Sequence, residues 1–322
     1  MRVAVAGLGL IGGSVALALA EAGHDVIGHD PDPATREAAA AHVAVAADPA
    51  ALLDSEVAVV AAPVKRLASV AAETFPPDRY RGLVTDTASV KAAAARAFAG
   101  HARFVGGHPM AGKETAGFAS AEPGLFRGRV WVLCLERGVR PAGRGGTDVG
   151  DWATLARLWT SIGARVVPAT ATDHDRAAAR ISHVEHLVAA ALVRVADDPL
   201  SRALAAGSFR DGTRVAASPT ALVAGMVAGN GPEVRSALVD LGMELDRARW
   251  ATEVREERPE AIAEWFDGAR ELRASWPPEP GAVERTALER ESLLALGAAG
   301  GWVEAVEDEV ALCRRPRVQS TS

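Results

Sequence analysis

The sequence predicts an α/β protein, in which an N-terminal Rossmann-type doubly wound parallel sheet is followed by an all-helical domain. Up to about residue 170, short apolar strands alternate with helical segments, which is typical of a parallel sheet with helices on both faces. From Thr172 to about Ser275 the pattern is helical, with no convincing strand. The length of 322 residues suits two domains. We expect domains over residues 1–170 and 171–280, and a C-terminal extension over 281–322.

The first α/β unit contains a glycine-rich turn. Residues 2–6 read as a buried strand, and the run from Gly7 to Ser14 leads into a helix over 15–22. In such a turn the first glycine permits the bend, the second lets the backbone approach a pyrophosphate, and the third lets the helix pack on the strand. The pattern predicts a bound dinucleotide; a βαβ unit without nucleotide is the alternative. The predicted binding residues are Gly7, Gly9, Leu10, Ile11 and Gly12.

The end of the second strand indicates which dinucleotide binds. Asp30 follows a strand over 25–29, about 20 residues after the glycine turn, where an acidic residue binds the ribose hydroxyls. A 2′-phosphate would meet Asp30 and Asp32 and no arginine before Arg36. The sequence therefore favours NAD over NADP. The alternative is that Asp30 only caps a helix.

Three residues follow strand ends where ligands of an open parallel sheet bind. They are Pro63, Ser89 and His108, of which Pro63 and Ser89 are expected near the cofactor. Further strands are expected over 56–61, 82–85, 102–105, 129–135 and 164–167, and helices over 64–74, 91–99 and 151–161.

The segment Gly106–Glu114 is the strongest candidate for chemistry. Its glycines and Pro109 disfavour a regular helix or a central strand, so we expect a loop held in one shape. His108 within it titrates near neutral pH. We expect His108 to carry the reaction.

The helical half contains a pair of histidines. His183 and His186 share one face of a long helix expected over 173–196. They could face a substrate, cap and pack, or hold a metal ion together with His174 or Glu185. The helix lacks the glutamate base of a metalloprotease, so we favour the substrate and predict no metal.

An irregular segment expected over 207–218 brings Arg210 and Arg214 close together in sequence. An arginine fork binds a carboxylate through two hydrogen bonds, but surface arginines that bridge helices are an equal alternative. Other helices are expected over 197–206, 219–229, 232–250, 254–274 and 284–296, with a linker over 276–281 and a hairpin or edge strand over 300–313.

Composition narrows the class of protein. The formal net charge of −6 argues against a nucleic-acid partner. The two cysteines, Cys134 and Cys313, are expected to be free thiols in a reducing compartment. No signal peptide or membrane span is evident, so we expect a cytoplasmic protein without a membrane partner.

These motifs together resemble the prephenate/arogenate dehydrogenases of tyrosine biosynthesis. The resemblance covers about residues 1–275, in the family's order. Its elements are Gly7 to Ser14, Asp86-Thr-Ala-Ser-Val-Lys91, Gly107-His-Pro-Met-Ala-Gly-Lys-Glu114, His174-Asp175, Ser182-His183 with His186, and Phe209-Arg-Asp-Gly-Thr-Arg214.

The resemblance implies NAD-dependent oxidative decarboxylation of prephenate to 4-hydroxyphenylpyruvate. Hydride leaves ring C4 for NAD⁺, and carbon dioxide leaves C1. His108 would take the proton of the C4 hydroxyl, and Ser89 would bond that hydroxyl or His108. Arg214 would hold a carboxylate of the dicarboxylate cyclohexadienol substrate. Arg210, His183, His186 and Glu114 would line the pocket, and the helical domain would form a homodimer.

The chain departs from the family pattern at Ala88, Glu185 and Leu222. Glu185 could face an amino group, which keeps open an arogenate dehydrogenase that gives tyrosine directly. Leu222 keeps open a 4-amino-4-deoxyprephenate dehydrogenase of secondary metabolism. The extension after residue 280 is too short for a regulatory ACT domain, so feedback by tyrosine through such a domain is not expected.

Two other classes of protein are alternatives. A β-hydroxyacid or imine reductase would favour a catalytic lysine in the helical domain, but no lysine follows Lys113. A non-catalytic NAD-sensing protein would bind NAD without turnover. The combination of His108, Ser89 and Arg214 argues against it.

Overall fold

The computed structural model describes residues 1–113, 115–138, 146–254 and 258–317. It divides into two compact units. The first contains Met1–Asp175, Ser218–Gly229 and Ala282–Arg315. The second contains Arg176–Ala217 and Asn230–Gly281, with the described residues after Arg315.

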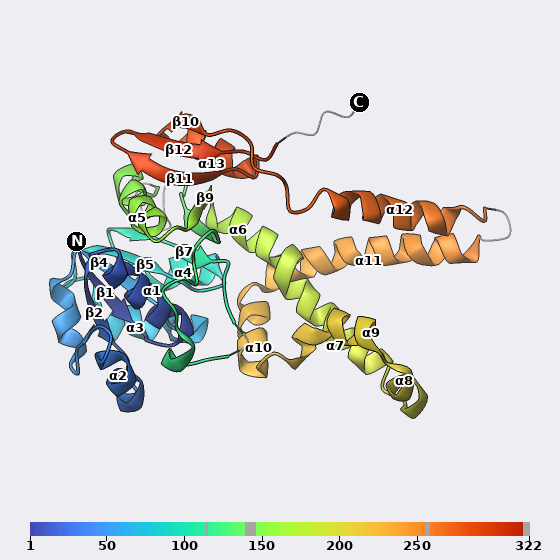
Figure 1. Cartoon of the computed structure of the whole chain (residues 1–322), viewed down its shortest axis with the longest axis horizontal. Helices are drawn as coiled ribbons and strands as arrows, with labels where there is room; N and C mark the ends of the chain where they lie inside the picture. The colour runs from blue at the N-terminus through green and yellow to red at the C-terminus, as the bar shows by residue number, and fades with distance from the viewer. Residues whose placement is uncertain (114, 139–145, 255–257, 318–322) are drawn as a thin grey trace. The chain divides into compact units, whose positions relative to one another are not determined.

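The first unit contains the predicted parallel sheet, whose six strands have the order β3-β2-β1-β4-β5-β6 (Figure 1). The alternating residues of β1 enter two different cores: Val3 and Val5 pack with α1, while Ala4 and Ala6 pack with α3 and α4. The Rossmann-type fold class is therefore confirmed. The strands are β1 Arg2–Ala6, β2 Asp25–His29, β3 Ala44–Val45, β4 Val57–Val60, β5 Leu83–Asp86 and β6 Phe104–Val105. The first helices are α1 Leu10–Glu21, α2 Pro33–Ala40, α3 Leu67–Glu73 and α4 Lys91–Ala97.

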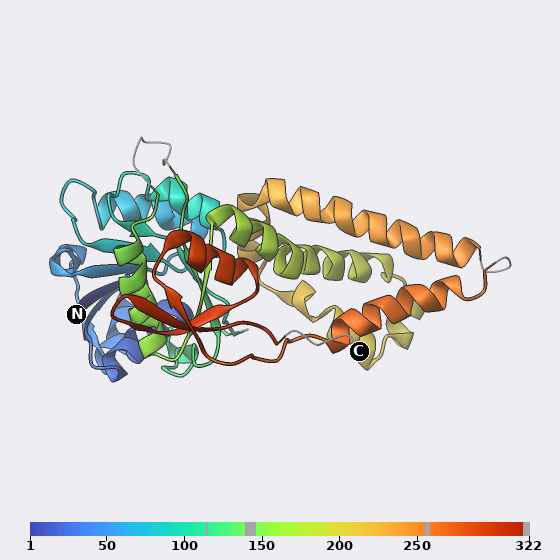
Figure 2. The same cartoon turned by 90° about the horizontal axis from the view of Figure 1, so that it is seen from above.

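A second six-stranded sheet in the same unit was not expected. Its order is β10-β12-β11-β9-β8-β7, so two strands predicted near 129–135 and 164–167 exist but do not continue the first sheet. The C-terminal extension joins this sheet because β11 pairs with β9. Figure 2 shows the β11–β12 hairpin beside α5. The strands are β7 Gly107–Pro109, β8 Val130–Cys134, β9 Arg165–Ala169, β10 Glu284–Ala287, β11 Trp302–Glu307 and β12 Val310–Arg314, with helices α5 Val149–Ser161 and α13 Arg290–Ala298.

Two local predictions in this unit were wrong. Gly107–Pro109 is an edge strand, because its backbone pairs antiparallel with β8, although the sequence suggested a loop. The helix expected over 284–296 is a strand followed by a helix, since β10 gains ladder hydrogen bonds from β12 that local propensity does not reveal. Cys134 and Cys313 are buried free thiols, as expected.

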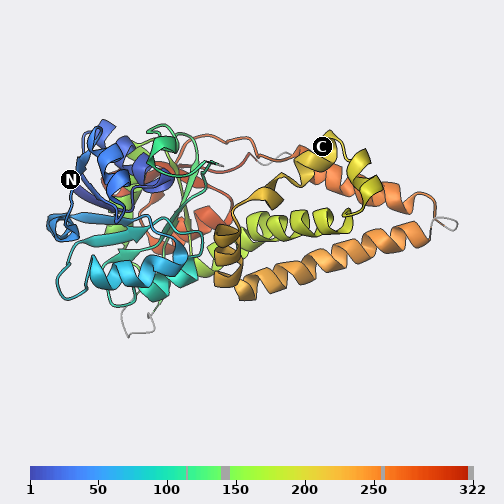
Figure 3. The same cartoon turned by 90° about the horizontal axis from the view of Figure 1, so that it is seen from below.

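The second unit is helical. Figure 3 shows α7 alongside α11. The expected long helix contains a π-helical turn over Ala179–His183, and short helices replace the irregular segment expected over 207–218. The helices are α6 Ala171–Ala178, in which the two units meet along the chain, α7 Val184–Val195, α8 Pro199–Leu204, α9 Gly207–Gly212, a 3₁₀ turn Arg214–Ala217, α11 Gly231–Glu253 and α12 Ala261–Ala274.

Helix α10, Thr220–Gly229, belongs to the first unit, although it was expected in the helical domain. It packs on the turn Val64–Arg66 that follows β4. None of the helices in the described ranges is long and apolar enough to cross a membrane.

Candidate active site

The glycine turn after β1 has the geometry of a dinucleotide-binding turn. Gly7 has φ +95°, and a Cβ there would lie 2.4 Å from Ala61 O. A Cβ on Gly12 would lie 1.8 Å from Gly7 O, whereas one on Gly9 would meet nothing within 4 Å. Gly7 and Gly12 are thus required by the fold. Gly9 leaves open space at the N-terminus of α1, where a pyrophosphate fits.

Asp30 lies at the end of β2 and is tied to this turn. Its Oδ2 accepts a hydrogen bond from Leu8 N (2.8 Å), and its Oδ1 accepts one from Asp32 N (3.0 Å). The helix cap is Asp32, which accepts from two amides of α2, so the capping alternative for Asp30 is wrong. Arg36 donates to the Asp30 backbone carbonyl (2.7 Å), so this arginine lies beside Asp30.

His108 lies on β7 and is the first member of a chain of hydrogen-bonded side chains. Its Nδ1 lies 2.8 Å from Nε2 of His174, and His174 Nδ1 lies 2.8 Å from Asp175 Oδ1. The two rings meet edge to face at 73°. His174 and Asp175 are buried, so these hydrogen bonds are shielded from water.

Asp175 sets the direction of the hydrogen bonds in this chain. It also accepts from the backbone amides of Lys91 (2.7 Å) and Ala92 (2.8 Å). Burial alone would raise the pKa of Asp175, but the hydrogen bonds from His174 and these amides lower it below its usual value. The carboxylate is therefore ionised and only accepts. When both rings are neutral, His174 donates through Nδ1 and accepts at Nε2, so His108 donates through Nδ1 and carries its lone pair on Nε2.

Four residues of this network were not among the predicted site residues. They are Asp86, Lys91, His174 and Asp175. Lys91 forms an ion pair with Asp86 at 2.5 Å, and both side chains have 0% exposure. A sequence signal existed, because all four stand in the family motifs, two of them on either side of Ser89.

Pro63 and Ser89 follow β4 and β5 as predicted. Pro63 precedes the turn Val64–Arg66, and Ser89 is half-buried on the segment between β5 and α4. His108 Nδ1 is bound to His174, so the predicted contact of His108 with Ser89 or substrate would be made through Nε2. The contact of Ser89 with His108 or the substrate stays a prediction.

The predicted histidines and arginines of the helical half lie in the second unit. His183 is buried at the end of the π-helical turn, and Asn230 Nδ2 donates to its Nδ1 (3.2 Å). Single π turns are frequent at functional sites. His186 donates through Nδ1 to Val215 O (3.1 Å), so a neutral His186 carries its lone pair on Nε2.

Arg210 and Arg214 are exposed, and Arg210 lies 3.8 Å from Asp211. Glu185 is also exposed. The approach of the second-unit residues to His108 stays a prediction. Glu114 lies outside the described residues.

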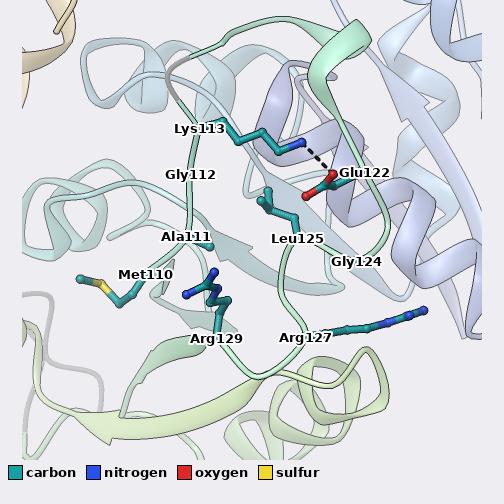
Figure 4. A pocket seen from close by; sticks show the side chains of 9 residues that line it. All are labelled: Met110, Ala111, Gly112, Lys113, Glu122, Gly124, Leu125, Arg127 and Arg129. Carbon is teal, nitrogen blue, oxygen red and sulfur yellow. Dashed lines mark ion pairs between the residues drawn. The ribbon is translucent and has the colours of Figure 1, made fainter. Parts of the chain in front are cut away.

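A cavity of about 410 Å³ is lined in part by Met110 and the residues after it, which follow His108 closely in sequence (Figure 4). Lys113 and Glu122 form an ion pair across it (2.8 Å), which gives Lys113 a structural partner. The lining residues are Met110, Ala111, Gly112, Lys113, Glu122, Gly124, Leu125, Arg127 and Arg129. In the part of the chain that the structure describes, no group of three or more His, Cys, Asp or Glu side chains could hold a metal ion.

Comparison with known proteins identifies the family. A model described as the prephenate dehydrogenase nucleotide-binding domain matches residues 15–168, and one described as the prephenate dehydrogenase dimerization domain matches 170–268. The prephenate dehydrogenase of Bacillus subtilis is 30% identical, over 85% of this chain and 76% of its own length.

Solved structures agree with this match. Synechocystis arogenate dehydrogenase is 29% identical, with a TM-score of 0.72 over 86% of this chain and 100% of its own. Prephenate dehydrogenase from Aquifex aeolicus, in complex with hydroxyphenyl propionate and NAD⁺, is 24% identical and shares the fold, with a TM-score of 0.74 over 85% of this chain and 98% of its own. The glycine turn, the histidine on the β7 edge and these matches lead to one conclusion: the chain belongs to the prephenate dehydrogenase family.

Proposed function

We propose that this protein catalyses the NAD-dependent oxidative decarboxylation of prephenate to 4-hydroxyphenylpyruvate, with His108 as the base. The observation that carries the proposal is the hydrogen-bonded chain from His108 through His174 to Asp175. In neutral His108 this chain leaves the lone pair on Nε2, and His108 follows β6 of the parallel sheet, at the end of the strands where ligands of this fold bind.

The proposed step begins with the ring hydroxyl of the substrate. Hydride loss from a carbinol carbon becomes easier as the hydroxyl proton is withdrawn, and a positioned base contributes about 10²–10⁴-fold. His108 Nε2 takes this proton. The positive charge that develops on the two imidazoles is stabilised by the Asp175 carboxylate at the other end of the chain. Departure of carbon dioxide makes the ring aromatic.

The residues around the glycine turn fit NAD. Gly9 leaves space for a pyrophosphate, and Asp30 at the end of β2 would accept hydrogen bonds from the ribose hydroxyls, as an acidic residue at this place does in dinucleotide-binding folds. When bound, the nicotinamide accepts the hydride. Arg36 lies next to Asp30, but its guanidinium is bound to the carbonyls of Asp30 and Pro31. We therefore propose NAD over NADP, with Leu10, Ile11, Pro63 and Ser89 as further cofactor contacts.

The substrate carries two carboxylates, and this acidic protein needs placed cations to hold them. We assign Arg214 to one carboxylate, and Arg210, His183, His186 and Glu114 to the pocket wall. Arg214 is an exposed residue, and an arginine binds a carboxylate through two parallel hydrogen bonds.

Arogenate is the second candidate substrate. It carries an ammonium group where prephenate has a keto group. His186 donates its Nδ1 proton to Val215 O, so its Nε2 is an acceptor and suits an ammonium donor better than a keto oxygen. The 29% identical Synechocystis arogenate dehydrogenase supports testing it.

The test is an NADH-formation assay with prephenate or arogenate, each with NAD⁺ or NADP⁺. We expect turnover of prephenate with NAD⁺ and a lower kcat/KM with NADP⁺. Preference for arogenate would select the second candidate. NAD⁺ binding without turnover of either compound would contradict the proposed function.

We also propose that the helical domain forms a homodimer. The match to a dimerization domain supports it. Large apolar side chains are exposed on α11, including Val239 (63%), Met243 (53%) and Trp250 (50%). An exposed apolar face of this kind is typical of a protein–protein contact.

A further inference from the structure

Gly107, the residue before the proposed base, is held at both of its backbone groups by one buried ion pair. Asp86 Oδ1 accepts from Gly107 N at 3.1 Å, and Lys91 Nζ donates to Gly107 O at 2.5 Å. The two side chains also bind each other and are fully buried. The backbone that carries His108 is therefore attached to β5 and α4 through charged groups.

The close approach of β7 to the end of β5 depends on the absence of a side chain at Gly107. A Cβ at position 107 would lie 2.7 Å from the Asp86 carbonyl oxygen and 3.0 Å from Trp131 Nε1. Contacts under 3.0 Å force something to move, and here the neighbour is backbone. Residue 107 must be glycine for β7 to lie against the end of β5.

The same lysine also belongs to the second attachment of His108. Lys91 is the first residue of α4, and Asp175 binds its backbone amide as well as that of Ala92. Asp175 in turn orients His174, which binds the ring of His108. The backbone before His108 and the ring of His108 are thus anchored to one residue, which closes a ring of contacts around the base.

We propose that Lys91 and Asp86 are positioning residues for His108, an inference that rests on the proposed function. A fully buried ion pair contributes little net stability compared with apolar side chains of similar volume. Its contribution here is geometric, because it holds a peptide group whose displacement moves the base. A displacement of about 1 Å in a reacting group can lower a rate about 10²-fold.

The test is the double variant Asp86→Asn/Lys91→Met. It removes both charges with little change in volume, so no buried charge is left unpaired. We expect kcat for the preferred substrate to fall on the order of 10²-fold, while NAD⁺ affinity, measured by fluorescence titration, stays close to that of the wild type. The matched control is Arg285→Met/Glu307→Gln, an exposed ion pair of the same unit (3.8 Å), which should leave kcat unchanged.

A second measurement separates positioning from general stability. The double variant is combined with His108→Asn, and the residual rates are compared. If the pair acts through His108, its removal costs little further rate once His108 is gone. An equal fold-loss in both backgrounds, or a wild-type kcat in the double variant, overturns the inference.

Gly107→Ala is the second variant, for the case that the double variant does not fold. It keeps the ion pair but displaces the strand, and we expect a similar kcat loss that disappears in the His108→Asn background. A wild-type kcat in Gly107→Ala overturns the inference. An inactive wild-type enzyme overturns the proposed function and this inference together, whereas an active wild type with an unaffected double variant overturns this inference alone.

Discussion

The proposed role of His108 depends on which of its two ring nitrogens carries the proton. Because Asp175 only accepts, both hydrogen bonds in the chain run toward Asp175 when the two imidazoles are neutral, and His108 then carries its lone pair on Nε2. A histidine free in solution interconverts between two tautomers. Here the hydrogen bond to His174 favours, for a neutral ring, the tautomer that the proposed role as base requires.

We expect His108→Asn to abolish most turnover, by about 10²–10⁴-fold, because an amide cannot take the hydroxyl proton. NAD⁺ affinity should stay unchanged, since the glycine turn and Asp30 are untouched. Steady-state NADH formation and fluorescence titration with NAD⁺ measure the two quantities. Turnover close to the wild type would remove His108 from its role.

Arg214→Ala tests the carboxylate assignment. We expect the KM for prephenate to rise by about 10-fold or more, because a charge-assisted hydrogen bond contributes roughly 1.5–3 kcal/mol. The KM for NAD⁺ should change little. Arg214→Lys is the matched variant, since it keeps the positive charge but loses the bidentate geometry of the guanidinium. Equal effects on both KM values would contradict the assignment.

Helix α4 is the element on which the site depends. Its first two amides, Lys91 N and Ala92 N, have no partner inside the helix and are bound by Asp175. Lys91 is buried, although a charged residue at the start of a helix usually faces solvent. The N-terminus of α4 is thus connected, through Asp175 and His174, to the proposed base His108.

Asp175→Asn should destabilise the protein at neutral pH. The pKa of Asp175 is lowered in the folded state, so its stabilisation is present above its unfolded pKa and is lost as the pH falls through the lower folded value. We expect the free energy of unfolding at pH 7 to fall by about 1.5–3 kcal/mol. The difference from the wild type should shrink below about pH 4.

Urea unfolding at several pH values measures this effect. The control is Asp198→Asn, since Asp198 caps α8 in the same way, accepting from Leu200 N and Ser201 N at 3.0 Å, but is exposed. We expect a smaller change there and no loss of kcat. A pH-independent difference for Asp175→Asn would show that its charge does not stabilise the fold.

At the scale of the whole molecule, the helical domain exposes several large apolar side chains. Val239, Met243 and Trp250 on α11 are joined by Phe266 and Leu272 on α12. The two helices contact each other, and each also carries an exposed ion pair, Arg247–Glu244 on α11 and Arg270–Asp267 on α12. A second copy of the chain is the occupant that the dimerization-domain match supports.

We expect a dimer in solution, and a shift toward monomer in Met243→Glu/Trp250→Glu, because two carboxylates would be buried in the interface. Light scattering coupled to size exclusion measures the mass. Val283→Glu is the control, since Val283 is exposed (49%) in the first unit. A monomeric wild type at micromolar concentration would contradict the dimer.

Local patterns were enough to predict much of this protein. Gly7 to Gly12 between a strand and a helix, Asp30 at the next strand end and His108 in a glycine-rich segment each depend on residues close together in the chain. The Rossmann-type sheet and the helical run after it follow from hydrophobic periodicity for the same reason.

Long-range contacts decided the rest. β7 and β10 are strands because their backbone hydrogen bonds are made with β8 and β12, which are distant in sequence. The short glycine-rich or polar sequences of β7 and β10 do not by themselves predict a strand. Asp175 meets Lys91, and His174 meets His108, across more than sixty positions of sequence. Whether a buried lysine, a carboxylate and two histidines form one network depends on where the fold places them. The sequence contains these residues in its motifs, but only tertiary packing joins His108, His174 and Asp175 by hydrogen bonds.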